Sequence, residues 1–254
     1  MTRHGDEARE KWVRIMGRRV LAHIWLKSFG IPGFIGLFFV AYFLLLYNPL
    51  FPITVMPFTA LDRWIGFHPW ALVAYLSLWI YVSLPPALIG DKRELIFYLW
   101  ACIGLSLAGM LIFLFWPTAT PTPDIDWSRY PGFQFLQSVG LARNACPSLH
   151  AAFAVFSGFW LARQLRELRA PLGLHIVNIL WCLAILYSTI ATRQHVALDI
   201  YAGSALGTVA FILHRQFLQR LSPATWCRSG TGGAIPELQR HSSIREKAPI
   251  IRER

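Results

Sequence analysis

Charged residues are scarce in this sequence of 254 residues. Lys, Arg, Asp and Glu make up 15% of the chain, hydrophobic residues make up 55%, and the mean hydropathy is +0.45. Soluble globular domains carry about 25% charged residues, so this composition excludes that class of protein. The sequence instead predicts an all-α, polytopic membrane bundle.

Several motifs that direct chains to other functions are also missing. No Gly-rich nucleotide-binding loop follows a strand pattern, no internal repeat is present, and the four cysteines show neither a disulfide framework nor metal-ligand spacing. The first apolar run follows a basic arm and lacks an Ala-x-Ala exit, so we expect no cleavable signal peptide. We interpret all four cysteines as structural.

Six apolar stretches could cross a bilayer as helices, which requires about 20 residues each. They are Ile31–Phe51, Trp70–Ile89, Leu95–Trp116, Pro147–Ala162, Leu174–Ala191 and Val196–Leu213, and the fourth is the shortest. We therefore predict a basic arm over residues 1–28, a six-helix membrane domain over residues 29–222, and a polar tail over residues 223–254. The tail has too few apolar residues to form a core, so we expect it to be disordered.

The distribution of basic residues predicts the orientation in the membrane. Of the 24 Lys and Arg residues, 20 lie in the arm, the tail and two alternate turns, and only four lie in the other three loops. Both termini are therefore expected in the cytoplasm. The net charge of +11 then reflects topology and anionic membrane lipids rather than nucleic acid. The arm fits a basic amphipathic helix on the membrane surface, although a merely solvated helix fits equally well.

Two histidines stand where apolar segments meet polar loops. His150 ends the run Cys-Pro-Ser-Leu-His, and His195 precedes Asp199 in Arg-Gln-His-Val-Ala-Leu-Asp. By the charge count, both histidines lie at the exoplasmic face, toward the periplasm, the outside or a lumen. An ionisable residue within a span is a functional candidate, and His195 is the available partner for Asp199 four residues away. We therefore predict one shared site.

Small residues continue the helix faces beneath both histidines. Ala154 and Gly158 follow His150 at four-residue steps, and Gly203 and Gly207 follow Asp199 in the same way. Such faces let membrane helices approach closely, so we predict that the fourth and sixth segments pack together and bring the histidines to one cavity. The alternative is a packing seam with histidines that only reach for interfacial water.

These residue types suit phosphoryl chemistry. A neutral imidazole can attack phosphorus when a carboxylate holds its other nitrogen, a role that fits His195 with Asp199. A second imidazole, His150, can transfer the proton. With Pro147 in the first helical position and Asn144 as the cap, the free backbone amides of Ser148 and its neighbour would bind phosphate.

The runs Asn-Ala-Cys-Pro-Ser-Leu-His and Arg-Gln-His-Val-Ala-Leu-Asp-Ile-Tyr-Ala-Gly resemble the second and third motifs of the type 2 phosphatidic acid phosphatase superfamily. The Leu before the first histidine is more similar to the branch that contains inositol phosphorylceramide synthases. The resemblance covers about Trp116 to Gly207. It implies a six-helix membrane bundle without metal or other cofactor, a phosphohistidine on His195 oriented by Asp199, and general acid work by His150.

The sequence departs from the superfamily pattern where cations are expected. The first motif, Lys-x6-Arg-Pro, is absent, and Ser188 and Thr189 occupy the positions of the usual Ser-Arg before the third-motif histidine. Phosphate charge must still be met by cations or amides. We predict Arg193 first and Arg143 second as phosphate-binding residues, together with Ser148.

The leading hypothesis is thus a metal-independent phosphatase or phosphotransferase that acts on a lipid phosphate, with water or a lipid or polyol alcohol as acceptor. One alternative is vanadate-dependent halide oxidation, since haloperoxidases share the superfamily's site. Another is a non-enzymatic protein that binds or scrambles lipids. The sequence leaves open the lipid, hydrolysis against transfer, the oligomeric state and the membrane compartment.

Overall fold

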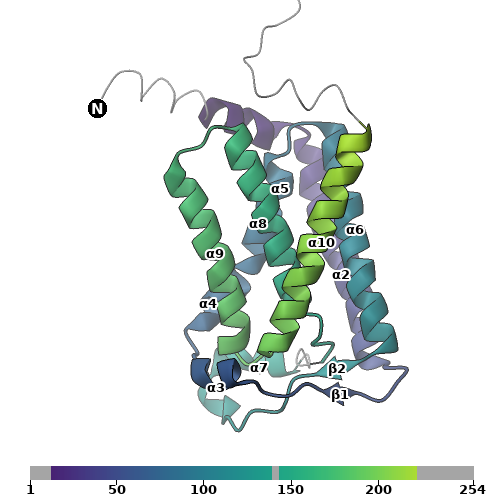
Figure 1. Cartoon of the computed structure of the whole chain (residues 1–254), viewed down its shortest axis with the longest axis vertical. Coiled ribbons are helices and arrows are strands. Elements are labelled where there is room, and N and C mark those ends of the chain that lie inside the picture. Colours follow the sequence, from purple (N-terminus) through teal and green to yellow (C-terminus); the bar gives the residue numbers. More distant parts are fainter. Residues whose placement is uncertain (1–12, 139–142, 222–254) are drawn as a thin grey trace, which may run out of the picture.

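The structure is a computed structural model that describes residues 13–138 and 143–221. The first part of the basic arm and the polar tail lie outside the described residues. The described chain is almost entirely helical, and its long helices run side by side along the vertical axis of Figure 1. The predicted all-α membrane bundle is confirmed.

Six long helical stretches form the bundle. They are α2 (Ile24–Tyr47), α4 (Ala71–Leu76) continued by α5 (Leu78–Leu88), α6 (Lys92–Phe115), α8 (Leu149–Glu167), α9 (Leu172–Ala191) and α10 (Ala197–Leu221). All of them except α8 are long and apolar enough to cross a membrane. Helix α8 has a lower hydropathy because polar residues occupy both of its ends, and it lies among α5, α6, α9 and α10.

Short elements gather at one end of the bundle. They are β1 (Thr54–Val55), β2 (Thr118–Ala119), α3 (Ala60–Ile65), the 3-10 turn η1 (Trp127–Arg129) and α7 (Pro131–Ser138). The two strands pair in parallel, with Thr54 opposite Thr118. Helices α8 and α10 both begin at this end (Figure 1), so their first turns face the short elements.

The opposite end holds the helical segment of residues 13–21 and the last turns of α10 (Figure 1). There Arg163 pairs with Glu94 at 2.7 Å and with Glu167 at 2.9 Å, while Arg19 reaches Glu167 at 3.4 Å. Arg19 thus ties the segment of residues 13–21 to α8, and Arg163 ties α8 to α6. The described chain therefore begins and ends on one side of the bundle.

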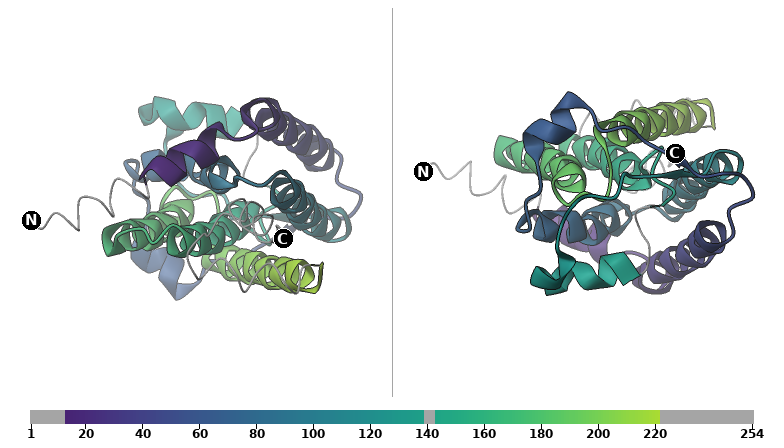
Figure 2. Two further views of the ribbon diagram at one scale, coloured as in Figure 1. Left: turned by 90° about the horizontal axis from the view of Figure 1, so that it is seen from above. Right: turned by 90° about the horizontal axis from the view of Figure 1, so that it is seen from below.

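Helices α8 and α10 pack through the glycines of α10. A Cβ atom at Gly203 would overlap the backbone carbonyl of Ser148, and one at Gly207 would overlap that of Ala152. The predicted close approach of these two segments is therefore correct, and the view along the bundle in Figure 2 shows them as neighbours. The predicted stripe on α8 is not the contacting face, because Gly158 lies against Tyr81 of α5 and Cys182 of α9 instead.

Candidate active site

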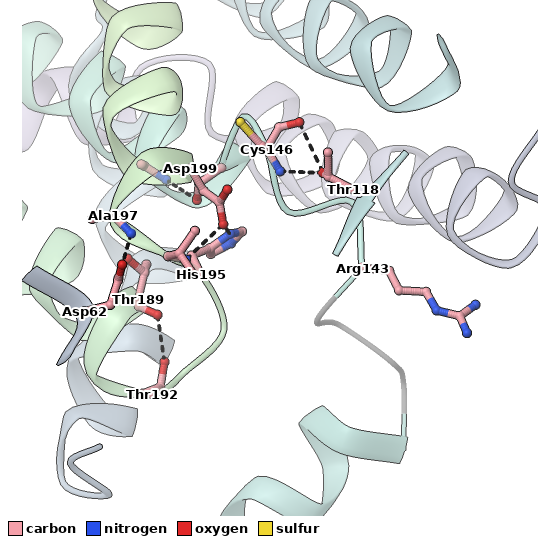
Figure 3. A network of polar contacts seen from close by, with 12 residues as sticks. Asp62, Thr118, Arg143, Cys146, Thr189, Thr192, His195, Ala197 and Asp199 are labelled. Atoms are coloured by element: carbon pink, nitrogen blue, oxygen red, sulfur yellow. Dashed lines mark hydrogen bonds and ion pairs between the residues drawn. The ribbon is translucent and has the colours of Figure 1, made fainter. Parts of the chain in front are cut away.

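His195 and Asp199 meet at the start of α10. The Nδ1 atom of His195 lies 3.5 Å from Oδ2 of Asp199, and the same oxygen accepts a hydrogen bond from the backbone N–H of Val196 at 2.9 Å. The carboxylate is fully buried, and the imidazole is 7% exposed. Figure 3 shows the carboxylate against one side of the ring. Because Nδ1 faces the carboxylate, Nε2 is the nitrogen left for chemistry.

The loop between α9 and α10 fixes the backbone of His195. Its N–H donates to the carbonyl of Thr189 at 3.1 Å, and the hydroxyl of Thr192 donates to the carbonyl of Ser188 at 2.7 Å. The hydroxyls of Ser188 and Thr189 themselves donate to carbonyls of the preceding helical turn. Ser188 keeps the usual Ser of this motif and Thr189 stands in place of the Arg; their backbone carbonyls hold the loop by accepting from Thr192 and His195.

A second buried carboxylate, Asp62 in α3, supports the same loop. Its Oδ1 accepts from the N–H of Ala197, the first residue of α10, at 2.7 Å, and its Oδ2 accepts from the N–H and the hydroxyl of Thr59, each at 2.7 Å. Asp62 is fully buried. The sequence pattern alone did not identify Asp62 as a residue of the site. The spacing Thr59-x-x-Asp62 resembles a capping box and was the available signal, but it does not reveal the contact with α10.

His150 lies in the first turn of α8, with its ring centre 6.1 Å from that of His195. Its imidazole stacks on Tyr75 at 4.4 Å and meets Trp79 edge-on at 6.0 Å. Its Nε2 atom is buried without a partner among the described residues. The structure thus places the two predicted histidines side by side, as the proposed chemistry requires.

Ser148 is the cap of α8. Its hydroxyl oxygen accepts from the N–H of Ala151 at 3.2 Å, and its own N–H donates to the carbonyl of Asp199 at 3.0 Å. The predicted start of this helix was therefore wrong: Pro147 precedes the cap, Asn144 is not the cap, and the amide of Ser148 already has a partner. The side chain of Ser148 stabilises α8, and its amide joins α8 to α10.

The side chains of the two predicted phosphate-binding arginines do not line the cavity of the histidines. The guanidinium of Arg193 donates to the carbonyl of Asp62 at 3.0 Å and lies over the ring of Phe58 at 5.2 Å. The side chain of Arg143 is exposed and points away from His195 in Figure 3. Neither arginine lines the cavity beside the histidines. The structure therefore brings together His150, His195 and Asp199, but not the two arginines.

A cavity of about 490 Å³ adjoins the two histidines. It is bounded mainly by apolar and aromatic side chains of α2, α5, α6 and α8. His150, His195 and Asn144 line it at the end with the short elements, and Lys27 lines it toward the opposite end. The cavity therefore runs along the bundle and offers an apolar chamber with polar groups near the histidines.

Cys146 lies beside the pair of His195 and Asp199. Burial and the nearby Asp199 carboxylate raise the pKa of its thiol to about 11, so the thiol is protonated near neutral pH. Among the described residues, no three His, Cys, Asp or Glu side chains gather in a way that could hold a metal ion.

A family model of the PAP2 superfamily matches residues 93–223, which is more than half of the chain. The matched region extends from α6 to the end of α10 and contains both histidines and Asp199. No curated protein and no solved structure matches the chain. The long apolar helices indicate an integral membrane protein. The chain therefore belongs to the PAP2 superfamily, whose members are phosphatases and phosphotransferases, and this membership supports an enzyme that acts on phosphoesters.

Proposed function

We propose that this protein is a lipid phosphatase or lipid phosphotransferase that works through a phosphohistidine on His195. The observation that carries the proposal is the contact of His195 with the buried Asp199. The ring centre of His195 lies 6.1 Å from that of His150, and both histidines line an apolar cavity. A carboxylate behind an imidazole fixes its tautomer and stabilises the positive charge that develops during attack.

The reaction has two steps. In the first, Nε2 of His195 forms a bond to phosphorus, the bond from phosphorus to the leaving oxygen breaks, and protonated His150 gives that oxygen its proton. In the second, neutral His150 takes a proton from water or an alcohol, whose oxygen attacks phosphorus. The bond between phosphorus and nitrogen then breaks, which restores His195. The acceptor decides the enzyme class, since exclusion of water by a bound alcohol favours transfer.

The cavity favours a lipid as substrate. Its lining is almost entirely apolar beyond the histidine end, and burial of hydrocarbon there is favourable in proportion to the apolar area removed from water. A phosphate beside His195 would allow the attached chain to extend along the bundle. We further propose that this end faces the exoplasm, as the distribution of basic residues predicts.

The test uses purified protein with labelled phosphatidic acid, polyprenyl diphosphate and phosphatidylinositol, each with and without ceramide or diacylglycerol. Release of labelled phosphate indicates a phosphatase, and movement of label to the acceptor indicates a transferase. Transfer to ceramide would support membership of the branch that contains inositol phosphorylceramide synthases. The sequence resembles that branch in having Leu before His150.

Two variants test the catalytic pair. His195→Ala should abolish turnover and the acid-labile phosphoenzyme, and Asp199→Asn should leave the nucleophile but reduce kcat by up to about 10⁴-fold. Full activity of His195→Ala would overturn the proposal and favour a protein that only binds or scrambles lipids. Halide oxidation that depends on added vanadate would instead favour the haloperoxidase alternative.

A further inference from the structure

Among the residues that the structure describes, few groups near the histidines are able to hold the charge of a phosphate. The guanidinium of Arg193 lies over Phe58, and the side chain of Arg143 points outward. The hydroxyls of Ser188 and Thr189 donate to backbone carbonyls. A transferring phosphoryl group needs donors already aimed at its oxygens, so another donor must serve this site.

Asn144 has the properties of such a donor. It lines the same cavity as His150 and His195, it is 4% exposed, and its Nδ2 atom has no hydrogen-bond partner among the described residues. A buried N–H without a partner is unfavourable. Gln194 also has an unpartnered buried amide, but it does not line the cavity. Asn144 is therefore the side-chain amide placed to meet a ligand there.

The backbone around Asn144 is anchored on both sides. Arg143 forms an isolated bridge with Ala119 of β2, and the N–H groups of Ala145 and Cys146 donate to the backbone and the hydroxyl of Thr118, the latter at 2.8 Å. Asn144 itself has a φ of 51°, a left-handed conformation in which Asn is enriched among residues other than Gly. These contacts fix the position of the residue before any ligand binds.

We propose that Nδ2 of Asn144 donates a hydrogen bond to a non-bridging oxygen of the substrate phosphate and thus replaces part of the missing cation set. This inference rests on the proposed function and deepens it by naming a phosphate-binding residue. A fixed neutral amide strengthens its hydrogen bond as negative charge develops on the oxygen, and it requires no rearrangement at that moment. Asn144 is then a catalytic residue in the sense that it touches the reacting group.

The experiment compares Asn144→Asp and Asn144→Gly with the wild type. The Asp variant keeps the shape of the side chain but replaces the donor by a negative charge, and the Gly variant removes the amide while tolerating the left-handed backbone. Removal of one such donor should lower kcat/KM by about 10²–10³-fold, and the Asp variant should lose more because it repels phosphate.

Asn178→Ala is the matched control, because Asn178 in α9 is also a buried amide but already has partners. Its Oδ1 accepts from Tyr81 at 2.7 Å, and its Nδ2 donates to the carbonyl of Gly158 at 3.0 Å. We expect this variant to have a lower Tm and a kcat/KM close to that of the wild type. The comparison of the Asn144 variants with Asn178→Ala would then distinguish a loss of phosphate binding from a loss of stability.

A binding measurement makes the test independent of turnover. Orthovanadate, which mimics phosphate, should raise the Tm of the wild type and of Asn178→Ala but not that of Asn144→Asp. An equal Tm shift in Asn144→Asp, or wild-type kcat/KM in both Asn144 variants, would overturn the role of Asn144. An inactive wild type that still binds vanadate through Asn144 would instead refute the proposed function and leave this site standing.

Discussion

At the scale of single residues, the pair of His195 and Asp199 depends on the first turn of α10. His195 lies in the preceding loop rather than on the helix, and Asp199 reaches back both to its imidazole and to the N–H of Val196. An acidic side chain in the first turn of a helix is also stabilised by the helix dipole. The start of the helix therefore holds Asp199 in a position where it can orient the histidine.

Cys146 provides a prediction at the same scale. Because its thiol has a pKa near 11, only a small fraction is thiolate at pH 7.5, and the thiolate is the reactive form. We expect N-ethylmaleimide to modify Cys146 very slowly at that pH and faster as the pH rises toward 11. Peptide mapping by mass spectrometry measures this rate, and the rate in the denatured protein is the comparison. Rapid modification of Cys146 at pH 7.5 would contradict the raised pKa.

The residue scale also shows what the sequence predicted well. The spacing of His195 and Asp199 predicted their contact, but the structure makes it in another way than two residues of one helix face: His195 lies in the loop before α10, and Asp199 contacts it from the first turn. The cap of α8 was assigned wrongly to Asn144, and the cap is Ser148. Both precede α8 within a few residues, and the helix start alone decides which of them is the cap.

At the scale of helices, the glycines of α10 set the distance to α8. Gly207→Ala should destabilise the protein by about 1–3 kcal/mol, as overpacking does, because its Cβ atom would overlap the backbone carbonyl of Ala152, which cannot move aside. Thermal unfolding in detergent measures the effect. Gly104→Ala in α6 is the matched control, since a Cβ atom there meets nothing within 4 Å. Equal Tm values for the two variants would contradict the close packing.

Asp62 provides the second prediction for this scale. Asp62→Asn replaces one of the two accepting oxygens by an NH₂ group. This group would then face the backbone N–H of either Thr59 or Ala197, so that two donors oppose each other. We expect a loss of about 1–3 kcal/mol in the free energy of unfolding and a lower kcat, because α3 would no longer fix the start of α10. Asp126→Asn is the control: Asp126 bonds Ser128 and Arg129 on the surface and should leave both quantities unchanged. A wild-type Tm for Asp62→Asn would show that this carboxylate is dispensable.

At the scale of the whole molecule, the two ends of the bundle differ in the elements and the charges that they carry. The short elements and both histidines lie at one end, and the segment of residues 13–21 lies at the other. Basic residues at this second end predict that it is cytoplasmic. The ion pairs of Arg163 and Arg19 lie there as well, so part of the basic charge also holds the bundle together.

Cysteine labelling in intact cells tests this orientation. In a background without the native cysteines, Thr122→Cys in the loop after β2 should react with a membrane-impermeant maleimide added outside. Pro171→Cys in the turn between α8 and α9 should react only after the cells are opened. Both positions are exposed in the structure, so burial does not explain a difference between them. The reverse pattern of labelling would place the histidines at the cytoplasmic face.

The sequence by itself determined the membrane class, the approximate spans and the pairing of His195 with Asp199. These follow from apolar length and from spacing within one turn, which are local properties. Only the tertiary structure decided that Asp62 docks on the N–H of Ala197, 135 residues away in the chain, and that Asn144 rather than the two predicted arginines lines the cavity beside the histidines. Those contacts depend on how distant loops pack over the ends of α8 and α10, and no local pattern specifies that packing.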